Sequence, residues 1–131
     1  MKKLFTLAIM ALTLAACQES LEEKAARDVK LFTRKNCPAK ISKTIIMDSL
    51  TFEPSTLTLH HYYTMTDEAD TVGGLNKDEA RAALLAALKN ETTTAAYKEA
   101  GYNFAYTYRS QKSPKTILFD TVFGKKDYSG K

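Results

Sequence analysis

The chain has 131 residues, of which 44% are hydrophobic and 26% are charged, and its formal net charge is +4. This composition is typical of a folded globular domain and excludes a disordered or collagen-like chain. The length fits a single domain with one modest core and is too short for a large enzyme built from many elements.

The first residues have the three parts of a secretory signal peptide. Two lysines follow Met1, residues 4–14 form an apolar run, and two alanines stand at positions 15 and 16. A transmembrane helix needs about 20 apolar residues, and this run has only 11. We therefore expect a cleaved signal peptide over residues 1–16 and no retained membrane span.

The end of that segment, Leu14-Ala15-Ala16-Cys17, resembles the lipobox of bacterial lipoproteins. The resemblance implies that signal peptidase recognises Leu14, Ala15 and Ala16, and that Cys17 becomes the lipid-bearing first residue of the mature chain. Gln18 after the cysteine implies sorting to the outer membrane, facing the periplasm. Two or three acyl chains give an effectively permanent anchor, since each buried CH₂ contributes about 0.8 kcal/mol. The alternative is an ordinary signal peptide with a chance cysteine.

Charge is distributed in blocks along the mature chain. Residues 24–43 contain seven basic side chains and one acidic one, whereas residues 44–76 contain five acidic side chains and no Lys or Arg. A basic block can indicate nucleic-acid binding, but an exported lipoprotein meets little nucleic acid. We expect no nucleic-acid partner. The expected partners are the membrane, through the lipid, and an unknown envelope protein.

A helix is predicted directly after the anchor. Ser20 and Glu23 form a capping box, and Cys37-Pro38 ends the helical pattern. The spacing places an apolar stripe on one face: Leu21, Ala25, Val29 and Phe32. A basic stripe lies away from it: Arg27, Lys30 and Arg34. Because residues 17–19 form a very short linker, we expect this basic stripe to lie near anionic headgroups; the alternative is a solvated helix face.

The remaining pattern predicts an α+β fold. Residues 41–53 and 56–66 are expected to form a hairpin, a helix begins after Asn76 and ends near Asn90, and a short helical piece covers residues 93–100. Two further strands are expected over residues 102–109 and 115–123, with a polar tail over residues 125–131. The predicted order is α-β-β-α-α-β-β within one domain over residues 20–124. It favours a four-stranded antiparallel sheet with the helices packed on one face.

The body of the chain also resembles small bacterial envelope lipoproteins, from which no function can be carried over. The shared features are Cys37-Pro38 after the first helix, Tyr62-Tyr63-Thr64 at the end of a strand, and Tyr106-Thr107-Tyr108 in a later strand.

Few residues suggest catalysis. If Cys17 is acylated, Cys37 has no intrachain partner, and it can be a buried small residue, an intermolecular disulfide or a catalytic thiol. His60 and His61 point to opposite faces of a strand and cannot bind one metal together, so we expect His61 in the core and His60 at the surface. No metal site and no catalytic residue is assigned. The tyrosines of residues 102–108 share a face that is either core or an aromatic binding platform.

These features predict a lipid-anchored envelope lipoprotein that acts as a small non-catalytic binding or adaptor module. Two alternatives remain open. One is an inhibitor or immunity-type protein directed against an exported enzyme, and the other is a small hydrolase or thiol enzyme that uses Cys37 or His61.

Overall fold

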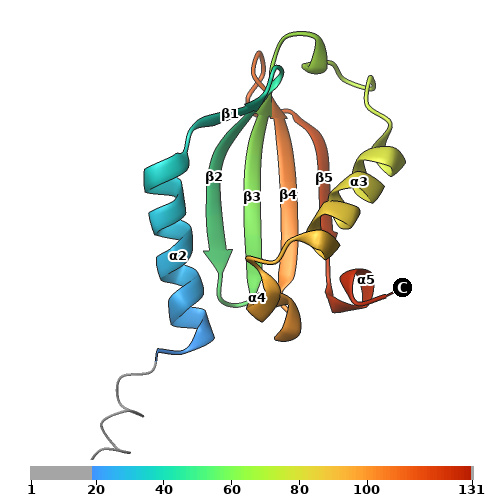
Figure 1. The fold of residues 1–131 in the computed structure, drawn as a ribbon. Helices are drawn as coiled ribbons and strands as arrows, with labels where there is room; N and C mark the ends of the chain where they lie inside the picture. Colours follow the sequence, from blue (N-terminus) through green and yellow to red (C-terminus); the bar gives the residue numbers. More distant parts are fainter. Residues whose placement is uncertain (1–18, 131) are drawn as a thin grey trace, which may run out of the picture.

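A computed structural model describes residues 19–130, so Leu14, Ala15, Ala16 and Cys17 lie outside the described residues (Figure 1). The helices are α2 (Leu21–Asn36), α3 (Lys77–Asn90), α4 (Ala95–Glu99) and α5 (Lys125–Tyr128), with a short 3₁₀ turn η1 (Asp67–Ala69). The strands are β1 (Ala39–Ser42), β2 (Ile45–Glu53), β3 (Thr58–Met65), β4 (Asn103–Ser110) and β5 (Ile117–Phe123). No helix in this part of the chain combines the length and the apolar character needed to cross a bilayer.

The α+β class is confirmed, but the predicted four-stranded antiparallel sheet is wrong in two respects. The sheet has five strands in the order β1-β2-β3-β4-β5, because a turn at Lys43 and Thr44 divides the first extended segment into β1 and β2. The central pair β3 and β4 is parallel, while the other three pairs are antiparallel. The chain leaves β3 at one end of the sheet and returns to β4 at the other through α3 and α4, as a crossover connection requires.

Helix α2 begins as its sequence predicts and protects one edge of the sheet. The Ser20 side chain accepts a hydrogen bond from the Glu23 backbone N–H, and the Glu23 side chain accepts one from Ser20, which completes the capping box. Beside the helix, the Thr33 hydroxyl donates to the Leu50 carbonyl and accepts from the Leu50 N–H, both at 3.0 Å. The helix therefore satisfies backbone groups of β2 at a stretch that β1 does not pair.

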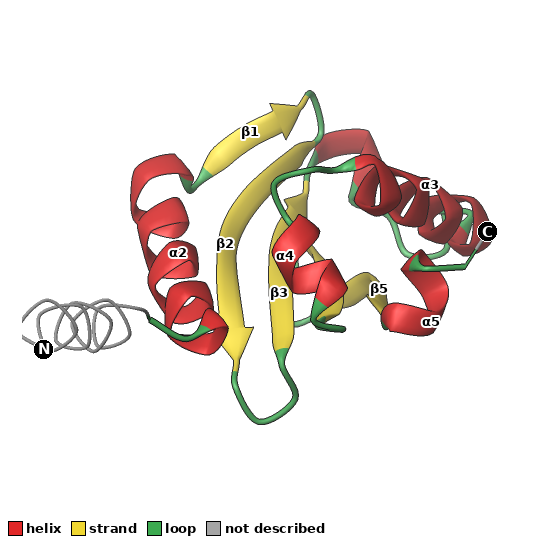
Figure 2. Cartoon of the chain, turned by 60° about the horizontal axis from the view of Figure 1, so that its bottom comes forward, coloured by secondary structure: helices red, strands yellow, loops and turns green. Residues whose placement is uncertain are grey.

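The core lies between the sheet and the helices, which gather over one face (Figure 2). Side chains of β4 alternate so that Phe104, Tyr106 and Tyr108 point into this core, and Phe104 is fully buried. Helix α2 contributes Ala25 and Val29. The aromatic face of this strand is therefore largely core, although two of its rings also line the groove described below.

The C-terminal segment extends the domain beyond residue 124 and corrects the expected polar tail over residues 125–131. Residues 125–128 form the short helix α5, in which Tyr128 is only 8% exposed. The Tyr128 hydroxyl lies 2.8 Å from the Tyr102 carbonyl oxygen and 3.2 Å from that of Lys98, and it can donate to either. This tyrosine ties the end of the chain to α4 and to the start of β4.

Candidate functional site: an apolar groove

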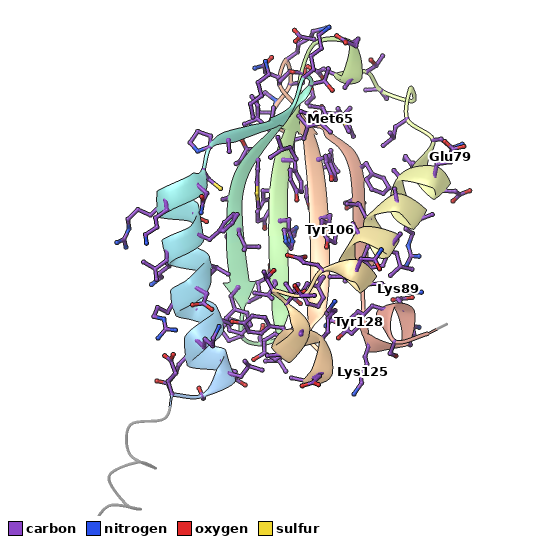
Figure 3. All side chains as sticks on the ribbon, viewed as in Figure 1. Met65, Glu79, Lys89, Tyr106, Lys125 and Tyr128 are labelled. Atoms are coloured by element: carbon purple, nitrogen blue, oxygen red, sulfur yellow. The ribbon has the colours of Figure 1, made fainter. Side chains whose placement is uncertain are left out.

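The helices leave part of the sheet uncovered, and this part forms a groove. Three adjoining hollows of about 260, 370 and 160 Å³ lie over the strands. The second and third share Phe32 of α2, and the first and second share Leu84 of α3. Figure 3 shows Met65 near one end of the sheet and Tyr106 near its middle, in the space between these two helices.

The two walls of the groove differ in size and shape. On α2, the large apolar side chain of Phe32 lines the groove and remains 38% exposed. On α3 the lining is mostly alanine, with Ala80, Ala83 and Ala87 beside Leu84. Small residues allow another helix to approach closely, whereas large apolar residues supply contact area. The shape and lining of the groove are therefore suited to binding an apolar helical segment.

The floor of the groove is aromatic. His61 stacks on Tyr106 with ring centroids 4.5 Å apart, and Tyr63 stacks on Tyr108 at the same distance. Burial lowers the pKa of His61 to about 4, so its imidazole is neutral in the physiological range. Burial also raises the pKa of Tyr108 to about 12 and the pKa of Tyr63 and Tyr106 further still. The floor thus carries neutral polar groups among apolar side chains.

His61 lies on the core-facing side of the sheet, but it is only partly buried and lines the groove instead of joining the core. Its Nδ1 lies 3.3 Å from the Ala105 carbonyl oxygen on the neighbouring strand. No carboxylate forms a hydrogen bond with the His61 ring within residues 19–130, so the side chain lacks the orienting acid that a general base in a catalytic triad usually has.

His60 lies on the opposite face of the sheet, as the strand alternation predicts. It is less exposed than a typical surface histidine, since its side chain is 19% accessible. Its Nε2 lies 2.7 Å from the Thr107 hydroxyl, and its Nδ1 lies 3.1 Å from the Tyr62 hydroxyl and 3.4 Å from Glu53. These contacts hold the open face of the sheet together, and no cavity of the groove includes them.

Cys37 is a free thiol that caps the C-terminal end of α2 and packs against the core. Burial, with a contribution from Asp48, raises the pKa of this thiol above its ordinary value. A raised pKa disfavours the thiolate that a catalytic cysteine needs. The environment favours the structural interpretation of Cys37 over the thiol-enzyme alternative.

The three basic residues proposed for membrane contact do not behave alike. Arg27 forms an ion pair with Glu19 at 2.5 Å and with Asp28 at 3.4 Å. Lys30 and Arg34 are exposed, and no carboxylate of the described segment forms an ion pair with them. The free part of the stripe is therefore Lys30 and Arg34.

Sequence reasoning did not find the groove, although two signals were present. Phe32 already belongs to the predicted apolar stripe of α2, and the alanines of α3 widen the apolar face of that helix beyond what one sheet contact needs. Among residues 19–130, no group of three His, Cys, Asp or Glu side chains is arranged to hold a metal ion.

Solved structures with low sequence identity share this fold. A protein from Pseudomonas aeruginosa, described as secreted, superimposes with a TM-score of 0.63 at 15% identity and covers 81% of this chain and 95% of its own. The pilotin EpsS of the Vibrio vulnificus type 2 secretion system gives a TM-score of 0.67 at 10% identity, over 85% of this chain and 94% of its own. The pilotin AspS of the Vibrio cholerae type II secretion system gives a TM-score of 0.62 at 13% identity. The match covers 87% of this chain and 97% of the pilotin.

No curated protein matches the sequence. The model of a protein family described as a domain of unknown function, DUF8479, matches residues 20–119, which run from the N-cap of α2 into β5. This match covers most of the chain and includes both walls and the floor of the groove. The chain therefore belongs to the DUF8479 family.

Proposed function

We propose that the protein is a lipid-anchored, non-catalytic adaptor of the bacterial envelope that holds a helical segment of another envelope protein in its groove. The observation that carries the proposal is the open, mostly apolar groove between α2 and α3. A soluble protein rarely leaves such a surface unused, because covering apolar area yields about 25 cal/mol for each Å² removed from water.

The structurally similar proteins support the part of the proposal that concerns location in the cell envelope. Two of them are pilotins of type II secretion systems, and a third is described as secreted. The sequence supports an anchored location, because the Leu14-Ala15-Ala16-Cys17 motif resembles a lipobox and Gln18 implies the outer membrane. The proposed partner is accordingly a protein that reaches the periplasmic side of that membrane.

The experiment is site-specific photocrosslinking in cells that produce the full-length chain. A photoreactive amino acid in place of Phe32 lies in the groove, whereas the same group in place of Lys30 lies on the outer side of α2. We expect one discrete adduct from position 32 that position 30 does not give. Mass spectrometry of the adduct then identifies the partner and shows whether it is an exported enzyme, as an inhibitor would require. Identical adducts from both positions, or no adduct from position 32, would contradict the proposal.

We further propose that Lys30 and Arg34 add an electrostatic contact between α2 and anionic lipid. Each such residue near an anionic surface contributes about 1 kcal/mol, and the attraction is screened by salt. The domain without its lipid should sediment with anionic vesicles at low salt and should be released at high salt. The variant with Lys30→Gln and Arg34→Gln should remain in the supernatant. Equal sedimentation with neutral and anionic vesicles, or none with either, would contradict this contact. Lys30 and Arg34 would then simply form a solvated face of the helix.

A further inference from the structure

One ring nitrogen on the floor of the groove is held as a hydrogen-bond acceptor. A carbonyl oxygen can only accept, so the His61 Nδ1 that lies 3.3 Å from the Ala105 oxygen must carry the proton. With the imidazole neutral, Nε2 then has a free lone pair. Among residues 19–130 no group forms a hydrogen bond with this nitrogen.

Three tyrosine hydroxyl groups on the same floor also have no hydrogen-bond partner within residues 19–130. Tyr63, Tyr106 and Tyr108 are 8%, 6% and 8% exposed, and their rings line the groove. None of their hydroxyls is hydrogen-bonded within the described part of the chain, in contrast to the hydroxyl of Tyr128. These three hydroxyls are not enclosed and are free to bond to a ligand, whereas the Thr94 hydroxyl, which lines the same hollow as His61, is buried without a partner among residues 19–130. A buried polar group without a partner is unfavourable, so this hollow favours a ligand that forms hydrogen bonds.

A carboxylate lies at the rim beside this cluster. Glu91 follows the last residue of α3 and lines the same hollow as His61, Tyr63 and Tyr106. The Thr93 hydroxyl donates to its Oε1 at 2.6 Å and so orients the carboxylate. The nearby ammonium of Lys98 is instead hydrogen-bonded to the carbonyl oxygens of Leu88 and Glu91, both at 2.6 Å. Within residues 19–130, no cation forms an ion pair with the Glu91 carboxylate.

We propose that the groove selects a partner segment with a Lys or Arg side chain, whose charged end binds the cluster formed by Glu91, His61, Tyr63 and Tyr106. This inference rests on the proposed function, because it names the chemistry of the segment that the groove holds. The ring nitrogen and the carboxylate accept hydrogen bonds, so the ligand must bring donors. The aliphatic stem of a basic side chain fits between Phe32 and Leu84, and the stacked rings favour a cation further.

The test uses three probes with the same six-carbon chain: hexylammonium, hexanol and hexanoate. Each is titrated into the folded domain while the NMR signals of the His61 and Tyr106 rings are followed. All three can fill apolar space, but only hexylammonium brings a positive charge and three hydrogen-bond donors to the acceptor cluster, whereas hexanol brings one neutral donor and hexanoate none. We expect it to bind about tenfold more tightly than hexanol, a difference of about 1.4 kcal/mol, and we expect hexanoate to bind most weakly.

Two substitutions separate the cluster from general charge. Glu91→Gln should bring the affinity for hexylammonium down to that for hexanol and leave hexanol binding unchanged. Glu99→Gln removes the same charge from exposed α4 and should change neither. If hexanol and hexylammonium bind the wild-type domain equally, the basic-residue inference is overturned while the groove stands as an apolar seat. If no probe perturbs the NMR signals of the groove, both the basic-residue inference and the proposed function of the groove are contradicted.

Discussion

Replacing Phe104 with alanine is expected to lower the free energy of unfolding by about 3–5 kcal/mol, the largest effect of any single core substitution proposed for this domain. Phe104 has no exposed surface, and it makes an edge contact with Tyr128, whose ring centroid lies 5.6 Å away. Removing its ring leaves a cavity beside Tyr128 of α5. Total stability for a domain of this size is about 5–15 kcal/mol, so the variant should lose a large part of it.

Urea denaturation followed by circular dichroism measures this change on the domain without its lipid. The matched control is Val122→Ala on the outer face of β5, where the side chain is 57% exposed. That substitution should change the unfolding free energy by less than about 0.5 kcal/mol. A loss below about 1 kcal/mol for Phe104→Ala would contradict the placement of its ring at the centre of the core.

The second large effect concerns the anchor. Cys17→Ser should abolish lipid attachment, because the thiol is the atom that the lipobox resemblance assigns to acylation. We expect an uncleaved precursor or a released protein in place of a membrane-bound mature form, measured by fractionation and intact mass. Cys37→Ser is the matched control, since Cys37 lies in the folded domain and should leave the membrane-bound fraction unchanged. A Cys17→Ser protein of unchanged mature mass in the membrane fraction would show that the lipobox interpretation is wrong.

Local signals in the sequence predicted the elements well. The capping box at Ser20 and Glu23 and the cap at Asn76 correctly locate the starts of α2 and α3. Gly101, with φ at 81°, closes the short helical piece before β4. These features depend on neighbouring residues, whose chemistry can be read directly from the chain.

Long-range pairing was harder to predict because periodicity does not encode which strands meet. The alternation in β3 and β4 gives each strand a buried face, but the same alternation fits parallel and antiparallel neighbours. The two helices between them are long enough for the crossover connection that a parallel pair requires, but they do not by themselves exclude an antiparallel pair. Tyr128 was missed for a similar reason, since one tyrosine in a polar segment shows no pattern until Tyr102 and Lys98 are beside it.

The groove, like the strand pairing, depends on contacts between residues that are far apart in the sequence. It arises where α2 and α3 stand apart over the sheet, and no local pattern measures the distance between two helices. The polar cluster combines residues from three separate parts of the chain: His61 and Tyr63 of β3 and Tyr106 of β4 lie on the floor, and Glu91 after α3 lies at the rim. In the sequence, these residues appear only as an expected core histidine, core aromatics and a charged residue in a loop.

The most direct measurement is the yield of the cross-link from position 32 when the opposite wall of the groove is filled. Ala87→Trp places a large ring into the groove, whereas Ala86→Trp places the same ring on the exposed side of α3. With equal amounts of folded protein in cells, Ala87→Trp should reduce the adduct at least about tenfold, the effect of losing about 1.4 kcal/mol of binding. Ala86→Trp should leave it unchanged. Equal adduct yields from both variants would contradict the claim that a partner occupies the groove.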